Sequence, residues 1–131
     1  MGEDTYEVVL FDLGGVLIRL GGVEAMQELA GLASEDEVWR RWLACPWVRR
    51  FERGQCSAEQ FADGLVSEWG LLVDPSDFIE RFGGWPEGPL PGALQLVDDV
   101  RARHRSGCLS NTNVLHWARA AQWGLGEMFE A

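Results

Sequence analysis

The stretch Val8–Leu17, which reads VVLFDLGGVL, decides the fold class of this chain. Its four apolar residues Val8–Phe11 are typical of a strand buried on both faces in a parallel sheet. Asp12 follows at the carboxyl end of that strand, where open α/β sheets bind ligands. Gly14 and Gly15 let the backbone turn sharply beside a ligand. The stretch predicts an aspartate nucleophile presented to a phosphoryl group, with an ordinary strand-to-turn junction as the alternative.

A second stretch, Cys108–Asn113 (CLSNTN), predicts a short strand that ends in a polar loop before a helix beginning near Val114. The Ser110 hydroxyl, the Asn111 amide and the N–H groups of that helix together suit an anion. The same residue types are preferred helix caps, so the alternative is a capping cluster without a ligand.

Taken together and in this order, the two stretches resemble the haloacid dehalogenase-like (HAD) hydrolase superfamily. FDLGGVL resembles the first motif of that superfamily, and LSNTN resembles the second. Between them, Phe51–Gln55 (FERGQ) and residues 57–69 resemble the helical cap of one branch, which contains sugar-phosphate phosphatases similar to α-glucose-1-phosphatase. The resemblance covers essentially the whole chain. The motif pair with the ERG element is fairly specific, whereas each piece alone is not.

The order of the expected elements is strand, helical insert, helix, strand and helix. It predicts two strands that pair in parallel through a right-handed crossover. The resemblance implies an α/β fold, a partial HAD-like Rossmann-type core with a helical cap inserted after the first strand. We expect core at residues 1–19, cap at 20–88, and core again at 89–131.

Local patterns place the helices of the expected cap. Ser34 with Glu37 and Ser57 with Gln60 match capping boxes. Pro46 is expected to end the first of these helices. The breaker-rich residues 83–92 predict a linker. Further helices are expected at 23–33, from Asp74-Pro75 to 82, from 93 to about 105, and at 114–123.

The resemblance implies a mechanism: transfer of a phosphoryl group to Asp12, followed by hydrolysis of the aspartyl-phosphate. It places Mg²⁺ between the Asp12 carboxylate, the Gly14 carbonyl and the phosphate. Ser110 and the backbone around Asn111 would hold a phosphate oxygen.

In the cap, the resemblance implies that Arg53 binds substrate, with Trp47 and Arg50 closing over it. The alternative for these arginines is a solvated helix face.

Two departures from the family pattern affect these expectations. Gly14 stands where the family usually has a second Asp acting as general acid and base, and neither Glu87 nor His116 is a persuasive substitute. The D-L-G-x-V form also occurs in the phosphatase branch named above, so this departure does not exclude phosphatase activity. The sequence contains no Lys, and after Asn113 its acids are Glu127 and Glu130. We therefore expect a chain truncated after the second motif, with Mg²⁺ weakly bound or absent. We also expect exposed sheet edges that favour self-association or a partner chain completing the sheet.

The function expected from the resemblance is hydrolysis of a phosphate monoester of a small phosphorylated metabolite, such as a sugar phosphate. One alternative is a non-catalytic pseudoenzyme or interaction module that keeps the cap and the phosphate loop. A second alternative is a 2-haloacid dehalogenase-type hydrolase, because that branch also lacks the second Asp.

Composition excludes some other classes. The chain has 131 residues, is 47% hydrophobic and carries a net charge of -10, which argues against a nucleic-acid partner. No membrane span or secretory signal is expected. Three cysteines without metal-ligand spacing fit a reducing cytoplasm. Five of the seven Trp lie in the middle segment, which predicts an aromatic core or a hydrophobic contact surface there.

Overall fold

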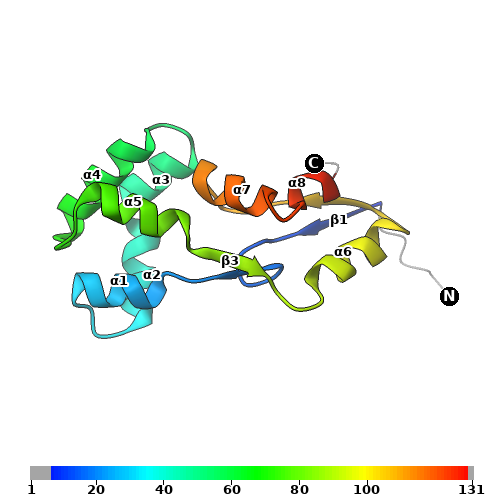
Figure 1. Cartoon of the computed structure of the whole chain (residues 1–131), viewed down its shortest axis with the longest axis horizontal. Helices are drawn as coiled ribbons and strands as arrows, with labels where there is room; N and C mark the ends of the chain where they lie inside the picture. The colour runs from blue at the N-terminus through cyan, green and yellow to red at the C-terminus, as the bar shows by residue number, and fades with distance from the viewer. Residues whose placement is uncertain (1–6, 130–131) are drawn as a thin grey trace. The chain divides into compact units, whose positions relative to one another are not determined.

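The computed structural model describes residues 7–129, which form four strands and eight helices (Figure 1). These residues belong to two units, each described here by itself. The α/β unit comprises residues up to Leu20, Pro86–Asn111 and the residues from Trp117 onward, and the helical unit comprises Gly21–Trp85 with Thr112–His116. In chain order, the elements are β1 (Val8–Phe11), β2 (Ile18–Leu20), α1 (Val23–Ala30), α2 (Glu35–Ala44), α3 (Pro46–Glu52), α4 (Ala58–Trp69), α5 (Pro75–Gly83), β3 (Pro86–Pro89), α6 (Ala93–Arg101), β4 (Arg105–Cys108), α7 (Val114–Ala121) and α8 (Leu125–Met128).

The parallel strand pair predicted from the sequence is confirmed. β1 pairs in parallel with β4, with Val8 opposite Arg105 and Phe11 opposite Cys108. α6 lies between the two strands in the chain, so a helix makes the crossover that a parallel pair requires. The core of this unit is apolar: Phe11, Leu13, Leu17, Ile18, Ala93, Val97, Ala120 and Leu125.

The prediction that β1 is buried on both faces is wrong. Val8 is 45% exposed and Leu10 is 58% exposed, whereas Phe11 is buried. Side chains alternate between the two faces of a strand, so Val9 and Phe11 face the core cluster while Val8 and Leu10 face the other way. An apolar run of this length does not by itself distinguish a strand covered on both faces from one covered on a single face.

β2 and β3 form an antiparallel pair that the sequence did not predict. Residues 83–92 contain enough Pro and Gly to predict a linker, yet Pro86–Pro89 form a strand with Pro89 opposite Ile18. Proline is tolerated in such a short ribbon because an edge position does not need its missing N–H donor. A bond from Leu90 N to Leu17 O, 2.8 Å long, extends the pairing.

The caps of the helical unit largely follow the sequence. At α4 the full capping box is present: Ser57 Oγ accepts from Gln60 N, and Gln60 Oε1 accepts from Ser57 N. At α2 only half of the predicted box forms. Ser34 Oγ accepts from Glu37 N, but the Glu37 carboxylate accepts from Ala33 N instead of from Ser34. The helix start is fixed in both cases, because a side chain satisfies an otherwise unpaired N–H of the first turn.

Several helices end earlier than their apolar patterns predicted. α1 ends at Ala30 because Gly31 adopts a left-handed conformation with φ 66°. α6 ends at Arg101 and α7 ends at Ala121. Pro46 stands at the start of α3, where its fixed φ suits the first helical position, and α2 already ends at Ala44.

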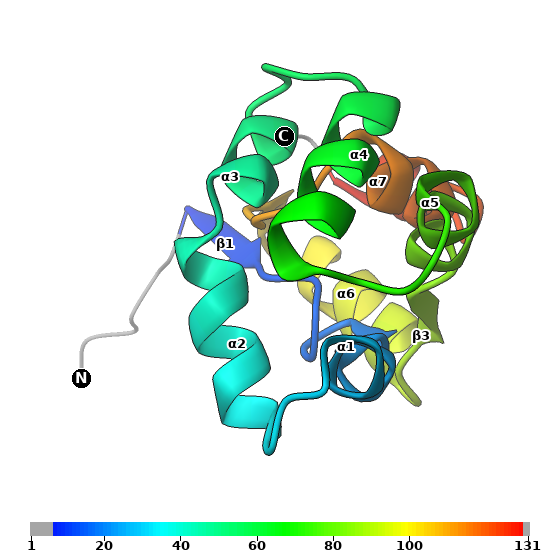
Figure 2. The same cartoon turned by 90° about the vertical axis from the view of Figure 1, so that its left-hand side faces the viewer.

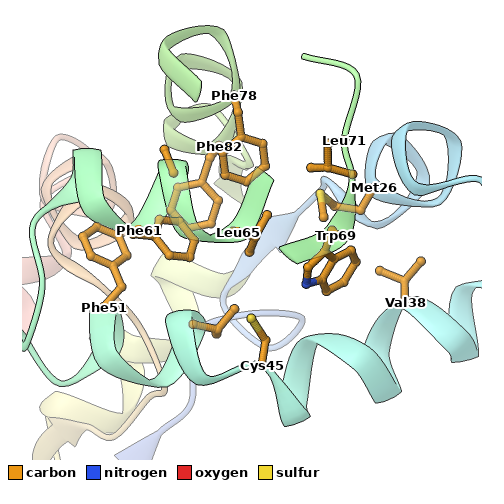
Figure 3. Close-up of a cluster of buried hydrophobic side chains, with 12 residues drawn as sticks. Met26, Val38, Cys45, Phe51, Phe61, Leu65, Trp69, Leu71, Phe78 and Phe82 are labelled. Carbon is orange, nitrogen blue, oxygen red and sulfur yellow. The ribbon is translucent and has the colours of Figure 1, made fainter. Parts of the chain in front are cut away.

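An aromatic core holds the helical unit together, as the tryptophan distribution predicted. Phe61 is fully buried, and its ring stacks on Phe51 with centroids 4.6 Å apart and planes at 8°. Phe78 and Phe82 point toward the same centre from α5 (Figure 3). α4 lies beside α3 and α5 (Figure 2), so the core joins three helices that follow one another along the chain. Aromatic pairs of this kind add about 0.5–1.5 kcal/mol each beyond their buried area.

His116 belongs to this core. Its Nε2 lies 2.7 Å from the Phe82 carbonyl oxygen and donates to it, while its ring stacks on the Phe82 ring at 4.2 Å. Burial lowers the pKa of His116, and the hydrogen bond to Phe82 partly opposes that effect. Because burial is the larger of the two effects, the folded state favours the neutral ring more than the unfolded chain does.

We expect His116 to make stability depend on pH. Because its pKa is lowered in the folded state, the unfolded chain takes up the proton first as the pH falls. The stabilisation is therefore complete above the ordinary histidine pKa of about 6.5 and is lost as the pH falls toward the lowered value. Urea unfolding from pH 8 down to pH 5.5 or so, compared with His116→Gln, measures this component. Identical pH profiles for the two proteins would contradict the assignment.

Among the described residues, no helix combines the length and apolar character needed to cross a membrane.

Candidate functional site

An open hollow of about 370 Å³ lies in the α/β unit, beyond the carboxyl ends of β1 and β4. It brings together four of the residues that the sequence singled out, Asp12, Gly14, Ser110 and Asn111. Arg53, the fifth, belongs to the helical unit. Six residues line the hollow: Asp12, Gly14, Leu20, Leu109, Ser110 and Asn111.

The strand register explains why these residues meet. Phe11 is opposite Cys108, so β1 and β4 end at the same edge of the sheet. Asp12 follows one residue after Phe11, and Ser110 follows two residues after Cys108. A bond from Leu109 N to Phe11 O, 2.9 Å long, continues the parallel ladder past the end of the strands. Parallel pairing therefore places the two motif loops side by side.

The Asp12 carboxylate is exposed and locally oriented. Its Oδ1 accepts a hydrogen bond of 2.8 Å from the N–H of Leu13, and the side chain lines the hollow. The charge of Asp12 also affects Cys108. Burial raises the pKa of the Cys108 thiol, and the negative charge of Asp12 raises that pKa further. Cys108 is therefore expected to be a neutral thiol near neutral pH.

A tight turn follows Asp12 directly in the chain. Leu13 is buried, and its carbonyl oxygen accepts from the N–H groups of Val16, Leu17 and Ile18 at 2.9–3.0 Å. Gly15 has φ 77°, a left-handed conformation that glycine adopts without steric cost. The turn thus fixes the backbone that follows the carboxylate, which is the role the sequence assigned to the glycine pair.

Gly14 faces a leucine. A Cβ built at Gly14 would lie 3.2 Å from Leu20 Cδ2, closer than ordinary side-chain contact. The φ of Gly14 is not among the positive values, so its backbone suits any residue. The side chain of Leu20, a residue that the sequence analysis did not single out, therefore fills the space next to Gly14. Leu20 enters the site through β2, the strand that sequence reasoning missed.

The helix after the second motif is capped by Asn113. Its Oδ1 accepts from the N–H groups of Leu115 and His116 at 3.1 and 3.0 Å. This is the capping role that the sequence analysis kept as the alternative. Two N–H groups that were expected to help bind an anion are thus already satisfied by Asn113.

The residues expected to close over the substrate make contacts within the helical unit. The Trp47 ring fills the space next to Gly64, where a Cβ would lie 2.2 Å from Cε2 of the ring. The Arg50 guanidinium lies over the Trp47 ring, 5.0 Å from its centroid. Arg53 is exposed and caps α3, with its N–H bonded to Arg49 O. A substrate-binding role for Arg53 stays a prediction.

The oxygen donors of the hollow suit a hard cation. Mg²⁺ favours carboxylate and carbonyl oxygens and is often held by one or two carboxylates together with water and substrate phosphate. Asp12 and the carbonyl of Gly14 offer that chemistry. Within residues 7–129 no group of three or more His, Cys, Asp or Glu side chains is placed to hold a metal. Asp12 is the one carboxylate among the residues that line the hollow, so its chemistry fits Mg²⁺ only with further oxygen ligands, and Mg²⁺ binding stays a prediction.

No protein-family model matches this sequence, and no curated protein matches it. Solved structures do match. A HAD family enzyme from Bacteroides thetaiotaomicron, in complex with magnesium and inorganic phosphate, has a TM-score of 0.70 and 21% identity, covering 96% of this chain and 67% of its own. A predicted HAD-like family hydrolase from Porphyromonas gingivalis has a TM-score of 0.67 and 22% identity, covering 95% of this chain and 63% of its own.

A third match is the L-2-haloacid dehalogenase from Xanthobacter autotrophicus with chloropropionic acid covalently bound. Its TM-score is 0.58 at 22% identity, and the match covers 97% of this chain and 56% of that one. The fold is therefore shared with phosphate-bound and haloacid-bound proteins alike, and it does not choose between their chemistries. The chain has the α/β fold of the HAD hydrolases, and its matches span 56–67% of the length of the three structures described.

Proposed function

We propose that this chain carries the nucleophile and phosphate-binding loop of a HAD-like phosphohydrolase. The proposed substrate is a monoester of a small phosphorylated metabolite, with sugar phosphates as the class that the sequence resemblance implies. The observation that carries the proposal is the hollow itself, where the Asp12 carboxylate, Ser110 and Asn111 meet beyond two parallel strands. A fold match to an enzyme in complex with magnesium and inorganic phosphate supports it.

The chemistry follows from the residues of the hollow. The Ser110 hydroxyl and the Asn111 amide would hold the phosphate oxygens and turn the phosphorus toward Asp12. An Asp12 oxygen then bonds to phosphorus, and the ester oxygen leaves with its electron pair. Water afterwards attacks the aspartyl-phosphate, releasing inorganic phosphate and restoring the carboxylate. Bound Mg²⁺ would neutralise charge on the phosphate.

Dehalogenation is the second candidate. In that reaction the Asp12 carboxylate would displace a halide from a 2-haloacid, and a halide departs without a proton. One observation favours it. The space beside Gly14 is filled by the apolar side chain of Leu20, which cannot give a proton to a leaving group, and a halide needs none. The covalent haloacid complex of the matching dehalogenase is consistent with a carboxylate acting in this way.

One experiment separates the candidates. Purified chain is assayed with Mg²⁺ against para-nitrophenyl phosphate for release of phosphate, and against 2-chloropropionate for release of chloride. Phosphate release that depends on Asp12 supports the proposal. Chloride release without phosphate release would replace it with the dehalogenase, and neither activity would favour a non-catalytic protein.

We expect Ser110→Ala to weaken phosphate binding. A hydrogen bond to a charged group is worth about 1.5–3 kcal/mol, so the Kd for inorganic phosphate should rise by about tenfold to a hundredfold. Calorimetric titration measures this effect, and Ser67→Ala on the exposed side of α4 is the matched control. A Kd unchanged in Ser110→Ala would remove this residue from the proposed site.

We expect Mg²⁺ and phosphate to bind cooperatively. A single carboxylate holds the cation weakly, whereas bound phosphate adds oxygen ligands and negative charge. Mg²⁺ affinity should therefore rise at least about tenfold at saturating phosphate, and phosphate affinity should rise by the same factor with Mg²⁺. Reciprocal calorimetric titrations test both directions. Independent binding of the two ions would contradict a shared site at Asp12.

A further inference from the structure

The hollow around Asp12 has a polar side and an apolar side. Asp12, Ser110 and Asn111 supply the polar side. Leu20 and Leu109 supply the apolar side, and they are 39% and 71% exposed. Neither leucine packs against the apolar core of the α/β unit. Single exposed leucines are common on protein surfaces, but two that line one hollow form an apolar contact surface for a ligand.

The parallel sheet fixes the backbone of Leu109. Its N–H donates to Phe11 O at 2.9 Å, which continues the β1–β4 ladder by one residue. Successive side chains along a strand point to opposite faces. Cys108 packs against the core cluster, so the next side chain, that of Leu109, points away from that core. The strand register thus presents Leu109 at the hollow.

A change of register in the antiparallel pair places Leu20. Arg19 is opposite Gly88, as part of a regular ladder. The next residue, Leu20, is opposite Pro86, so the pairing skips one residue of β3. Irregular pairing of this kind re-aims side chains and is frequent next to active sites. Ile18, on the same strand, is buried in the core, whereas Leu20 lines the hollow.

We propose that Leu20 and Leu109 determine specificity by contacting the C–H face of a sugar ring whose phosphate lies at the polar side of the hollow. The inference rests on the proposed function and assigns the residues that recognise the sugar. A sugar ring carries C–H groups on its faces and hydroxyl groups around its rim, so one face lies on apolar side chains while the hydroxyls stay in water. This contact removes the apolar surface of both leucines from water, which favours binding. Inorganic phosphate makes no such contact, because it has no carbon atoms.

The test compares substrates that have a sugar ring with one that has no carbon. The whole chain with Mg²⁺ is assayed on glucose 1-phosphate and glucose 6-phosphate, and on phosphoramidate, whose phosphoryl group is bonded to nitrogen. Leu109→Ala removes most of an apolar side chain and should lower kcat/KM for the better glucose phosphate by about tenfold, mainly through a higher KM. The kcat/KM for phosphoramidate and the Kd for inorganic phosphate should stay unchanged, because neither molecule reaches the leucines.

Three further variants make the test specific. Leu20→Ala should have an effect of the same kind as Leu109→Ala, since both leucines contact the ring. Leu109→Met keeps the volume and the apolar character, and it should keep most of the activity on the glucose phosphate. Leu96→Ala shortens an exposed leucine of α6 that does not line the hollow, and it should change the kinetics of no substrate.

The possible results separate this inference from the function beneath it. Unchanged kinetics on the glucose phosphate in Leu109→Ala and Leu20→Ala would overturn the inference and leave phosphohydrolase activity standing. An equal fall for glucose phosphate and phosphoramidate would also overturn it, because the leucines would then support Asp12 instead of contacting a sugar. Turnover of phosphoramidate with neither glucose phosphate would have the same consequence. No turnover of any of the three by the unmodified chain would overturn the proposed function, and the inference with it. If Leu109→Ala does not fold, as judged by circular dichroism, Leu20→Ala decides.

Discussion

Asp12→Asn is expected to abolish turnover while leaving the fold unchanged. The amide has the shape of the carboxylate but is a far weaker nucleophile and forms no acyl phosphate. Removing the nucleophile of a covalent mechanism should lower kcat by at least about a thousandfold. The fold should tolerate the change, because Asp12 is exposed and only its Oδ1 is bonded, to the N–H of Leu13. The amide oxygen of Asn accepts the same bond.

The measurement pairs kinetics with unfolding. Phosphate release by Asp12→Asn is compared with that of Asp98→Asn, which makes the same chemical change on an exposed face of α6, where Asp98 contacts Arg101 at 3.8 Å. Both variants should unfold at nearly the urea concentration of the parent. Wild-type turnover in Asp12→Asn would show that another group attacks the substrate, and the proposed mechanism would be abandoned.

Phe61→Ala is expected to unfold or severely weaken the helical unit. Phe61 is fully buried, stacks on Phe51 and contacts the Phe82 ring at 5.1 Å. Replacing a buried Phe with Ala costs about 3–5 kcal/mol, because transfer energy is lost and a cavity is left. That loss is a large part of the stability of a unit this small.

Tryptophan fluorescence during urea titration reports this effect, since five of the seven tryptophans belong to the helical unit. Leu72→Ala is the matched control, because Leu72 lies in the same unit and is 96% exposed. It should shift stability by less than about 0.5 kcal/mol. A small effect of Phe61→Ala would mean that the aromatic core does not carry the stability of this unit.

Much of the fold follows from local signals in the sequence. The capping box of Ser57 with Gln60 depends on neighbouring residues alone, and it is present in the structure. The parallel pair follows from two strands separated by a helix. Exposure of Val8 and Leu10 was not predictable, because it depends on which elements cover the far face of the sheet. The β2–β3 pair was missed because Pro86–Pro89 has the composition of a loop and acquires its strand character from Ile18–Leu20.

In the candidate site, too, residues with a local sequence signal were predicted, and residues placed by tertiary contacts were not. Asp12 and Ser110 were singled out by their places after expected strands and by the resemblance of the two stretches to family motifs, and parallel pairing brings them together. Leu20 and Leu109 carry no chemical signature, and their place at the hollow depends on the β2–β3 pair and on the strand register. Asn113 was foreseen only as part of a capping cluster. Which of several polar residues accepts the helix N–H bonds depends on a local geometry that composition does not specify.

The two ends of the inserted helical segment lie next to each other. Gly21 N donates to Trp85 O at 2.8 Å, and the Trp85 ring fills the space beside Gly22. The entropy of closing a loop grows only with the logarithm of its length, about 0.6 kcal/mol for each doubling, so a segment closed in this way can lengthen or shorten at little cost. Evolution could therefore exchange one insert for another at this junction without rebuilding the strand that precedes Asp12.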